Sequence, residues 1–163
     1  MIKRLFKNII LIFLLITIVN ANETIDINSK IKIAQKENKH LMVFFHIPHC
    51  PYCARMLKKN FKDGETLKEI EDNFIFVDLY TKDKSIVKFN DFSGSIKEFA
   101  SYIGATAYPA TFFIDQDKKT IFKSIGYRNT NELLLEIKYI ATQSYQTIDL
   151  EAFILKLEFE DDD

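Results

Sequence analysis

The segment VFFHIPHCPYC, residues 43–53, decides the fold of this chain. It continues an apolar run that begins at Leu41, and such a short run is typical of a strand buried on both faces. Two cysteines, Cys50 and Cys53, follow at once, and apolar residues then recur at helical spacing over residues 56–61. The segment therefore predicts a buried strand that leads directly into a helix, with the cysteines at the junction.

The spacing of the two cysteines indicates redox chemistry. A thiol is a good nucleophile only as thiolate, and the N-terminus of a helix favours negative charge at Cys50 because its backbone N–H groups are unpaired. Pro51 fits the first turn of that helix, where its missing N–H costs nothing. Cys53 lies one turn later on the same face. We therefore expect Cys50 to attack a substrate disulfide and Cys53 to resolve the mixed disulfide.

The composition of the chain excludes several other classes of protein. The chain has 163 residues, of which 47% are hydrophobic and 28% charged, so it predicts one globular domain. The formal net charge of -1 gives no reason to expect a nucleic-acid partner. Because the chain holds only two cysteines, a disulfide-rich scaffold and a four-thiolate zinc site are both excluded.

The beginning of the chain has the layout of a secretory signal peptide over residues 1–21. Three cations and no acid precede residues 9–19, which are apolar apart from one threonine, and residues 19–21 (VNA) provide the small residues of a cleavage site. We expect cleavage after Ala21, export to the periplasm, and a single mature domain over residues 22–163. An uncleaved membrane anchor is the alternative, although a span needs roughly 20 apolar residues. In an exported protein a cysteine pair can stay oxidised.

The pattern of the mature chain predicts alternating helices and strands. Ser95 and Glu98 have the spacing of a capping box, and Gly104 is placed to end the helix that they begin. The order predicts an α/β fold with a mixed central sheet of about four to five strands and helices on both faces. A C-terminal helical extension over residues 142–158 and an acidic tail over 159–163 follow. The expected elements are helices over 27–38, 51–63, 65–70, 95–104, 129–141 and 150–157, strands over 41–47, 74–77, 110–114 and 120–125, and a loop or short edge strand over 81–94.

Two segments resemble the thioredoxin superfamily, and the resemblance covers most of residues 27–141. Residues 43–53 match the strand, loop and helix around that family's active site, and residues 104–113 (GATAYPATFF) look like its proline loop entering a strand. The resemblance implies a cis bond between Tyr108 and Pro109, with backbone groups of Tyr108 docking an extended substrate. The pattern is most similar to bacterial periplasmic thioredoxin-like proteins of the sulfur-oxidation-associated type.

The active-site segment departs from the family's cytosolic reductants in three ways. His49 stands where tryptophan is usual, Phe44 stands where a buried aspartate is usual, and Pro51-Tyr52 resembles the dipeptide of glutaredoxins. We expect His49, Pro51 and Tyr52 to tune the reactivity of Cys50, because a neighbouring imidazolium stabilises a thiolate.

The resemblance implies an exported thiol–disulfide oxidoreductase, reductase-like rather than oxidase-like, that acts on disulfides of proteins or small thiols. The cysteines hold the electrons themselves, so no cofactor is expected. A membrane redox partner is expected to recharge them. Reductase, oxidase and isomerase directions all stay open at this point.

Other interpretations of the cysteine segment exist. Ligand types suited to zinc or copper stand close together in the sequence at His46, His49, Cys50 and Cys53. This set predicts a metal-handling protein as the alternative function. The pair could also be an inert structural disulfide, or the fold could serve as a redox-silent peptide-binding module. His46 alone is expected to be a packed or hydrogen-bonded residue rather than a base.

Overall fold

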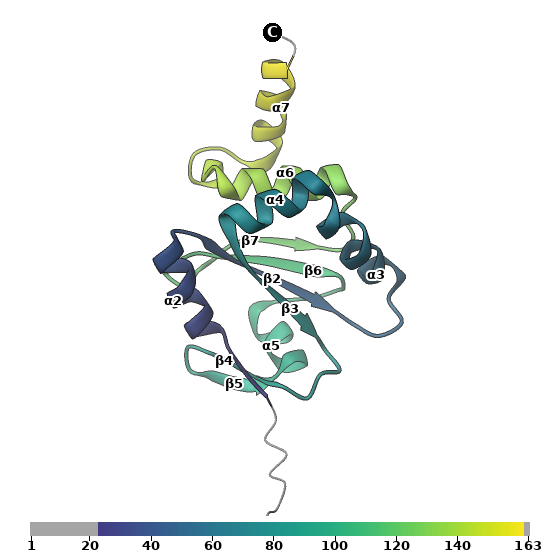
Figure 1. Cartoon of the computed structure of the whole chain (residues 1–163), viewed down its shortest axis with the longest axis vertical. Coiled ribbons are helices and arrows are strands. Elements are labelled where there is room, and N and C mark those ends of the chain that lie inside the picture. The colour runs from purple at the N-terminus through teal and green to yellow at the C-terminus, as the bar shows by residue number, and fades with distance from the viewer. Residues whose placement is uncertain (1–22, 162–163) are drawn as a thin grey trace, which may run out of the picture.

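The computed structural model describes residues 23–161, and the expected signal peptide lies outside them. Its central sheet has four strands in the order β3-β2-β6-β7, with β2 parallel to β3 and antiparallel to β6 (Figure 1). β7 closes the far edge, antiparallel to β6. The mixed sheet expected from the sequence is therefore confirmed. Its strands are β2 (His40–His46), β3 (Phe74–Tyr80), β6 (Ala110–Ile114) and β7 (Thr120–Ile125).

A second, smaller sheet was not foreseen from the sequence. Residues 81–94, for which the sequence predicts a loop or one short edge strand, contain two strands that form an antiparallel hairpin. A short N-terminal strand pairs with the hairpin in parallel. Each strand has only three or four residues, which is too short for a periodic pattern of apolar residues to predict it. The strands are β1 (Thr24–Asp26), β4 (Ile86–Phe89) and β5 (Phe92–Ser95).

Helices cover both faces of the central sheet, as expected (Figure 1). α2 and α5 pack against one face, whereas α3, α4 and α6 pack against the other. None of the described helices is long and apolar enough to cross a membrane. The helices are α2 (Ile27–Glu37), α3 (Pro51–Lys58), α4 (Gly64–Asn73), α5 (Ile96–Ile103), α6 (Thr130–Ala141) and α7 (Leu150–Asp161), with short 3-10 helices η1 (Asn60–Lys62) and η2 (Ser144–Gln146).

Strand β2 holds the two halves of the core together. Its residues 41–45 are fully buried and alternate between the two faces. Leu41, Val43 and Phe45 belong to the cluster beneath α2 and α5. Met42 and Phe44 belong to the cluster beneath α3, α4 and α6. This double burial explains the continuous apolar run, and it fixes the strand end from which the cysteine loop departs.

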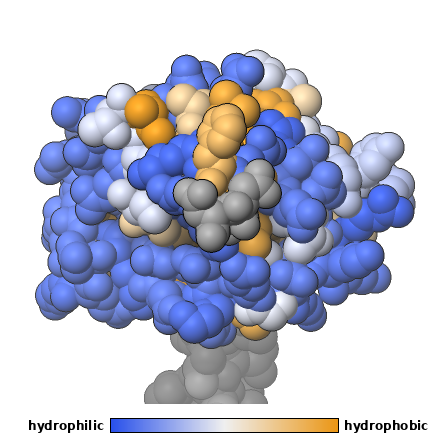
Figure 2. Space-filling view, turned by 90° about the horizontal axis from the view of Figure 1, so that it is seen from above, coloured by the Kyte–Doolittle hydropathy of each residue, from blue (hydrophilic) through white to orange (hydrophobic). Residues whose placement is uncertain are grey.

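The C-terminal extension ends in a helix that projects from the body of the molecule (Figure 1). It is attached at its base, where the Tyr139 hydroxyl donates to the Ile148 carbonyl at 2.7 Å and Phe153 is buried. Seen from above, apolar residues gather around this projection within a polar surface (Figure 2). Leu155 and Phe159 are exposed on it. The helix continues to Asp161, so it extends into the segment expected to be an acidic tail.

Candidate active site

The two cysteines form a disulfide at the beginning of α3. Cys50 is the N-cap residue, and its Sγ accepts a hydrogen bond from the Cys53 backbone N–H at 3.1 Å. The two Cα atoms lie 5.3 Å apart. Cys50 is partly exposed, whereas Cys53 is only 1% exposed. A substrate can therefore reach Cys50, and Cys53 lies behind it. The roles of nucleophile and resolving thiol stay predictions.

A pocket of about 450 Å³ opens beside the disulfide. Both cysteines line it, together with the end of β2, the loop that follows, and one side of α3. His46 and Tyr80 contribute two aromatic rings, and Lys58 contributes a cation. The pocket gives a substrate group space next to the bridge.

The three residues expected to tune Cys50 have different surroundings. His49 has a positive φ of 56° and an exposed side chain. Pro51 occupies the first turn of α3, as predicted. Tyr52 is 57% exposed on the outer side of the helix.

An aromatic contact joins α3 to the segment after β7. The rings of Tyr52 and Tyr127 lie 5.2 Å apart, and the Arg55 guanidinium lies 5.8 Å from the centre of the Tyr127 ring. Arg55 and Tyr127 are far apart in the sequence, and no local pattern predicts that they approach each other. The contact brings a second aromatic ring to Tyr52, the residue that precedes Cys53 in the chain.

The second segment of the family resemblance adopts the expected local geometry. The Tyr108–Pro109 peptide bond is cis, and the Pro109 carbonyl accepts a hydrogen bond from Gly126 N–H at 2.8 Å. The Tyr108 side chain packs partly against the core, and this burial raises the pKa of its hydroxyl. Neither residue lines the pocket beside the disulfide. Their role in substrate docking stays a prediction.

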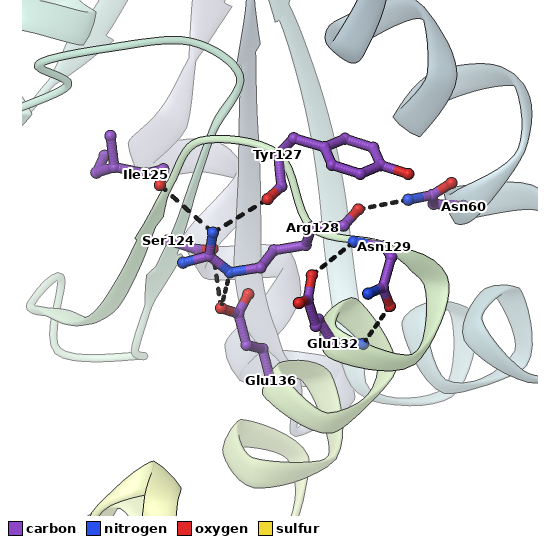
Figure 3. Close-up of polar contacts among 8 residues, drawn as sticks. All are labelled: Asn60, Ser124, Ile125, Tyr127, Arg128, Asn129, Glu132 and Glu136. Atoms are coloured by element: carbon purple, nitrogen blue, oxygen red, sulfur yellow. Dashed lines mark hydrogen bonds and ion pairs between the residues drawn. The ribbon is translucent and has the colours of Figure 1, made fainter.

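A buried polar network holds the segment between β7 and α6 (Figure 3). Arg128 Nε donates to Glu136 Oε1 at 2.6 Å, and Ser124 Oγ donates to the same oxygen at 3.0 Å. Asn60, which follows α3, donates to the Arg128 carbonyl at 2.5 Å. Burial raises the pKa of Glu136, against the opposing effects of Arg128 and Ser124. The network fixes the loop that presents Tyr127, and no local pattern in the sequence predicts it.

An imidazole–carboxylate pair lies at the end of β2. His46 Nε2 and Asp78 Oδ1 are 3.0 Å apart across the β2–β3 pairing. The His46 ring stacks on Tyr80 at 4.8 Å and on Phe44 at 5.8 Å, so its orientation is fixed. Burial raises the pKa of the Asp78 carboxyl, and the nearby His46 opposes that effect. His46 is packed and hydrogen-bonded, as the sequence predicts.

The metal-handling alternative finds no support in the arrangement of its ligands. Within residues 23–161, no group of three or more His, Cys, Asp and Glu residues is placed to hold a metal ion. His46 is turned to Asp78, and the two sulfurs are bonded to each other. The four side chains named from the sequence therefore do not converge on one centre.

Opening and closing the bridge between Cys50 and Cys53 moves two electrons, and its place at the start of a helix after a central strand defines the class of thiol–disulfide oxidoreductases. Residues 27–141 match the model of a thioredoxin-like domain, and the chain belongs to that family. The match identifies a thioredoxin-like domain and no subgroup of that family, so the sulfur-oxidation-associated type stays a prediction. None of the curated proteins matches the chain.

Solved structures of bacterial proteins share the fold. A thioredoxin-fold protein from Helicobacter pylori is 22% identical with a TM-score of 0.61, and 85% of this chain and 86% of that one are covered. A putative disulphide-isomerase from Bacteroides thetaiotaomicron is 24% identical with a TM-score of 0.57, covering 73% and 90%. A thioredoxin from Thermus thermophilus is 19% identical with a TM-score of 0.55, covering 74% and 88%.

Proposed function

We propose that this protein is an exported thiol–disulfide oxidoreductase that reduces disulfides of proteins or small thiols. The observation behind the proposal is the asymmetry of the bridge: Cys50 is partly exposed beside a pocket, whereas Cys53 is buried behind it. An exposed sulfur is the one that an external disulfide can meet. A buried partner reacts only with the sulfur next to it.

The reducing reaction follows from this asymmetry in two exchanges. The Cys50 thiolate attacks one sulfur of the substrate disulfide, which forms a mixed disulfide and releases the other sulfur as thiolate. Cys53 then loses its proton and attacks Cys50 Sγ, which restores the bridge and releases the second substrate thiolate. Two electrons pass from the dithiol to the substrate, and the two released thiolates take up two protons.

The surroundings of Cys50 favour the reducing direction. A dithiol is strongly oxidising when its thiolate form is greatly stabilised. Here the stabilising groups are few: one hydrogen bond from the Cys53 backbone N–H, and an imidazole at His49 that is exposed to solvent. The bridge is therefore expected to have a low potential, and a membrane donor of electrons would recharge it after each turnover.

Export is supported by the sequence that precedes the described residues. Residues 1–21 have the charge, apolar run and small residues of a signal peptide. A bridged cysteine pair also suits a compartment outside the cytosol. When the full chain is expressed in a Gram-negative host, mass spectrometry of the periplasmic fraction should find a mature N-terminus at Asn22. A membrane-bound chain that still begins at Met1 would contradict cleavage.

The reduction potential tests the direction of electron flow. Equilibration with glutathione buffers and quantification of the bridged form should give about −230 to −270 mV, the range of reducing catalytic dithiols. A value above about −150 mV would assign an oxidase instead. A value below about −300 mV would indicate an inert structural bridge.

A further inference from the structure

The buried cysteine presents a chemical problem that the bridge alone does not solve. Cys53 must give up its proton before it attacks Cys50, yet its side chain is only 1% exposed. Apolar, dehydrated surroundings disfavour a free thiolate. A neighbouring group that accepts the proton during the attack would remove this obstacle.

The pocket beside the disulfide contains four titratable side chains in addition to the cysteines. Lys58 on α3 is a cation with no lone pair to accept a proton, and Tyr80 on β3 is a phenol that normally holds its own proton. His49 is exposed on the loop before Cys50, on the side open to solvent. His46, the last residue of β2, is the remaining candidate, although its sequence context alone does not predict a base.

His46 lies on the sheet face that α3 covers. Phe44 precedes it by two residues, so both side chains point to the same face. Phe44 packs in the cluster that includes Met56 of α3, which is one turn beyond Cys53. The buried side of α3 and the His46 ring therefore belong to one layer, and both line the same pocket.

Asp78 prepares His46 for proton transfer. The carboxylate engages Nε2 at 3.0 Å, so that nitrogen holds a proton and Nδ1 is the nitrogen with a free lone pair. Stacking on Tyr80 and Phe44 keeps the ring from turning. Asp78 does not line the pocket itself, so it acts only through His46. The carboxylate also stabilises the imidazolium that forms when Nδ1 accepts a proton.

We propose that His46, oriented by Asp78, accepts the proton of Cys53 while Cys53 attacks Cys50 in the mixed disulfide. The S–H bond of Cys53 breaks, Nδ1 gains the proton, the Cys53–Cys50 bond forms, and the substrate sulfur leaves with the electron pair. In the opposite direction the His46 imidazolium returns the proton to Cys53 as the bridge opens. The inference deepens the proposed function and rests on it, since it assigns the proton in a step of that same reaction.

The rate of the second exchange tests this role. Reduced protein is mixed with oxidised glutathione, quenched with acid at intervals, and analysed by mass spectrometry for the Cys50–glutathione adduct and for the closed bridge. In His46→Phe, which keeps a ring for stacking, conversion of adduct to bridge should slow about 100-fold near neutral pH, the lower end of the range for general acid–base groups. The deficit should shrink as pH rises, because hydroxide then removes the proton directly.

Asp78→Asn provides the second variant, since it keeps a hydrogen-bond acceptor but removes the charge. The pH midpoint of its second exchange should shift downward, because the imidazolium loses a stabilising neighbour. His40→Phe is the matched control, a histidine at the other end of the same strand that does not line the pocket. It should leave both exchanges unchanged.

The outcomes test the role of His46 separately from the proposed oxidoreductase function. If His46→Phe and His46→Gln both close the bridge at the wild-type rate and pH profile, the inference is wrong, although the adduct still supports the proposed function. A loss of rate of equal size at every pH would also overturn the inference. A rate loss caused only by altered structure would not become smaller at alkaline pH. If the wild type forms no Cys50 adduct at all, the proposed function itself fails.

Discussion

Two helices of this protein begin with the same spacing of side chains and use it differently. In α6, Asn129 at the N-cap and Glu132 three residues later each accept a hydrogen bond from the other's backbone N–H. In α3, Cys50 and Cys53 have the same two positions, and their sulfurs are bonded to each other. The α6 cap consists of hydrogen bonds and has no redox chemistry, whereas the α3 bridge can be reduced and place a thiolate at unpaired N–H groups. Helix-start spacing alone therefore does not reveal function; the chemistry of the two side chains does.

The largest effect is expected from removing the third helical residue of α3. Cys53→Ser keeps the nucleophile but removes the resolving thiol, so mixed disulfides accumulate on Cys50 and turnover stops. Mass spectrometry after incubation with a disulfide-bonded peptide detects the adduct. The matched change in α6, Glu132→Gln, should leave exchange intact. Absence of any adduct on Cys50 would mean that the two cysteine roles are wrongly assigned.

A substitution in the polar network of α6 should lower the stability of the protein and leave disulfide exchange almost unchanged. Glu136→Ala leaves Arg128 and Ser124 without their shared acceptor, so the free energy of unfolding should fall by about 3 kcal/mol, the cost of breaking a buried pair. Urea denaturation measures it. Exchange of the folded variant with oxidised glutathione should stay within about threefold of wild type, since no atom of Glu136 lines the pocket. A larger loss of exchange would show that the two regions are coupled.

The raised pKa of Glu136 makes the stability of the α6 region depend on pH. Because burial raises the pKa of Glu136 above the ordinary 4.5, the folded protein binds this proton more tightly than the unfolded chain does. Its contribution to stability is therefore complete below pH 4.5 and is lost as pH rises through the raised pKa. Relative to Glu136→Gln, wild type should lose stability over that rise. Urea unfolding of both proteins at a series of pH values measures the difference in their free energies of unfolding. A difference that stays the same at every pH would contradict the prediction.

The smallest effect is expected from one acid in the first turn of α3. Tyr52→Glu places a negative charge beside the position of the thiolate, so attack by Cys50 should slow about two- to fivefold at low salt, consistent with about 0.3–1 kcal/mol for such charges. Stopped-flow reaction with a chromogenic disulfide measures the rate. Asn131→Glu, at the same position of α6, is the control and should not change it. An equal slowing in both variants would point to net charge rather than position.

Local signals in the sequence predict this fold well. The apolar run of β2, the capping boxes at Ser95 and Asn129, and the left-handed Gly104 that ends α5 all depend on neighbouring residues, and all are present. The second sheet could not be predicted in the same way. β4 pairs with its neighbour β5 and also with Thr24–Asp26, a contact between segments far apart in the chain. Its four residues give no periodic pattern of their own.

The same division applies to the candidate site. Cys50, Cys53 and Pro51 are adjacent in sequence, so their pattern is visible before folding. Asp78 reaches His46 only because β3 pairs with β2 in one particular register. Glu136 reaches Arg128 only because α6 packs back over β7. In sequence these acids look like any other charged residue among helices and strands.

The projecting C-terminal helix has a practical consequence for experiments. α7 is fastened at its base through Tyr139 and Phe153 and extends away from the body (Figure 1). None of its residues lines the pocket beside the disulfide. A dye, a surface linkage or a fused reporter placed at this end leaves the cysteines free to react. Immobilised through α7, the molecule would present its dithiol to dissolved substrates, so capture of covalent intermediates and single-molecule recording both become feasible without redesign of the active site.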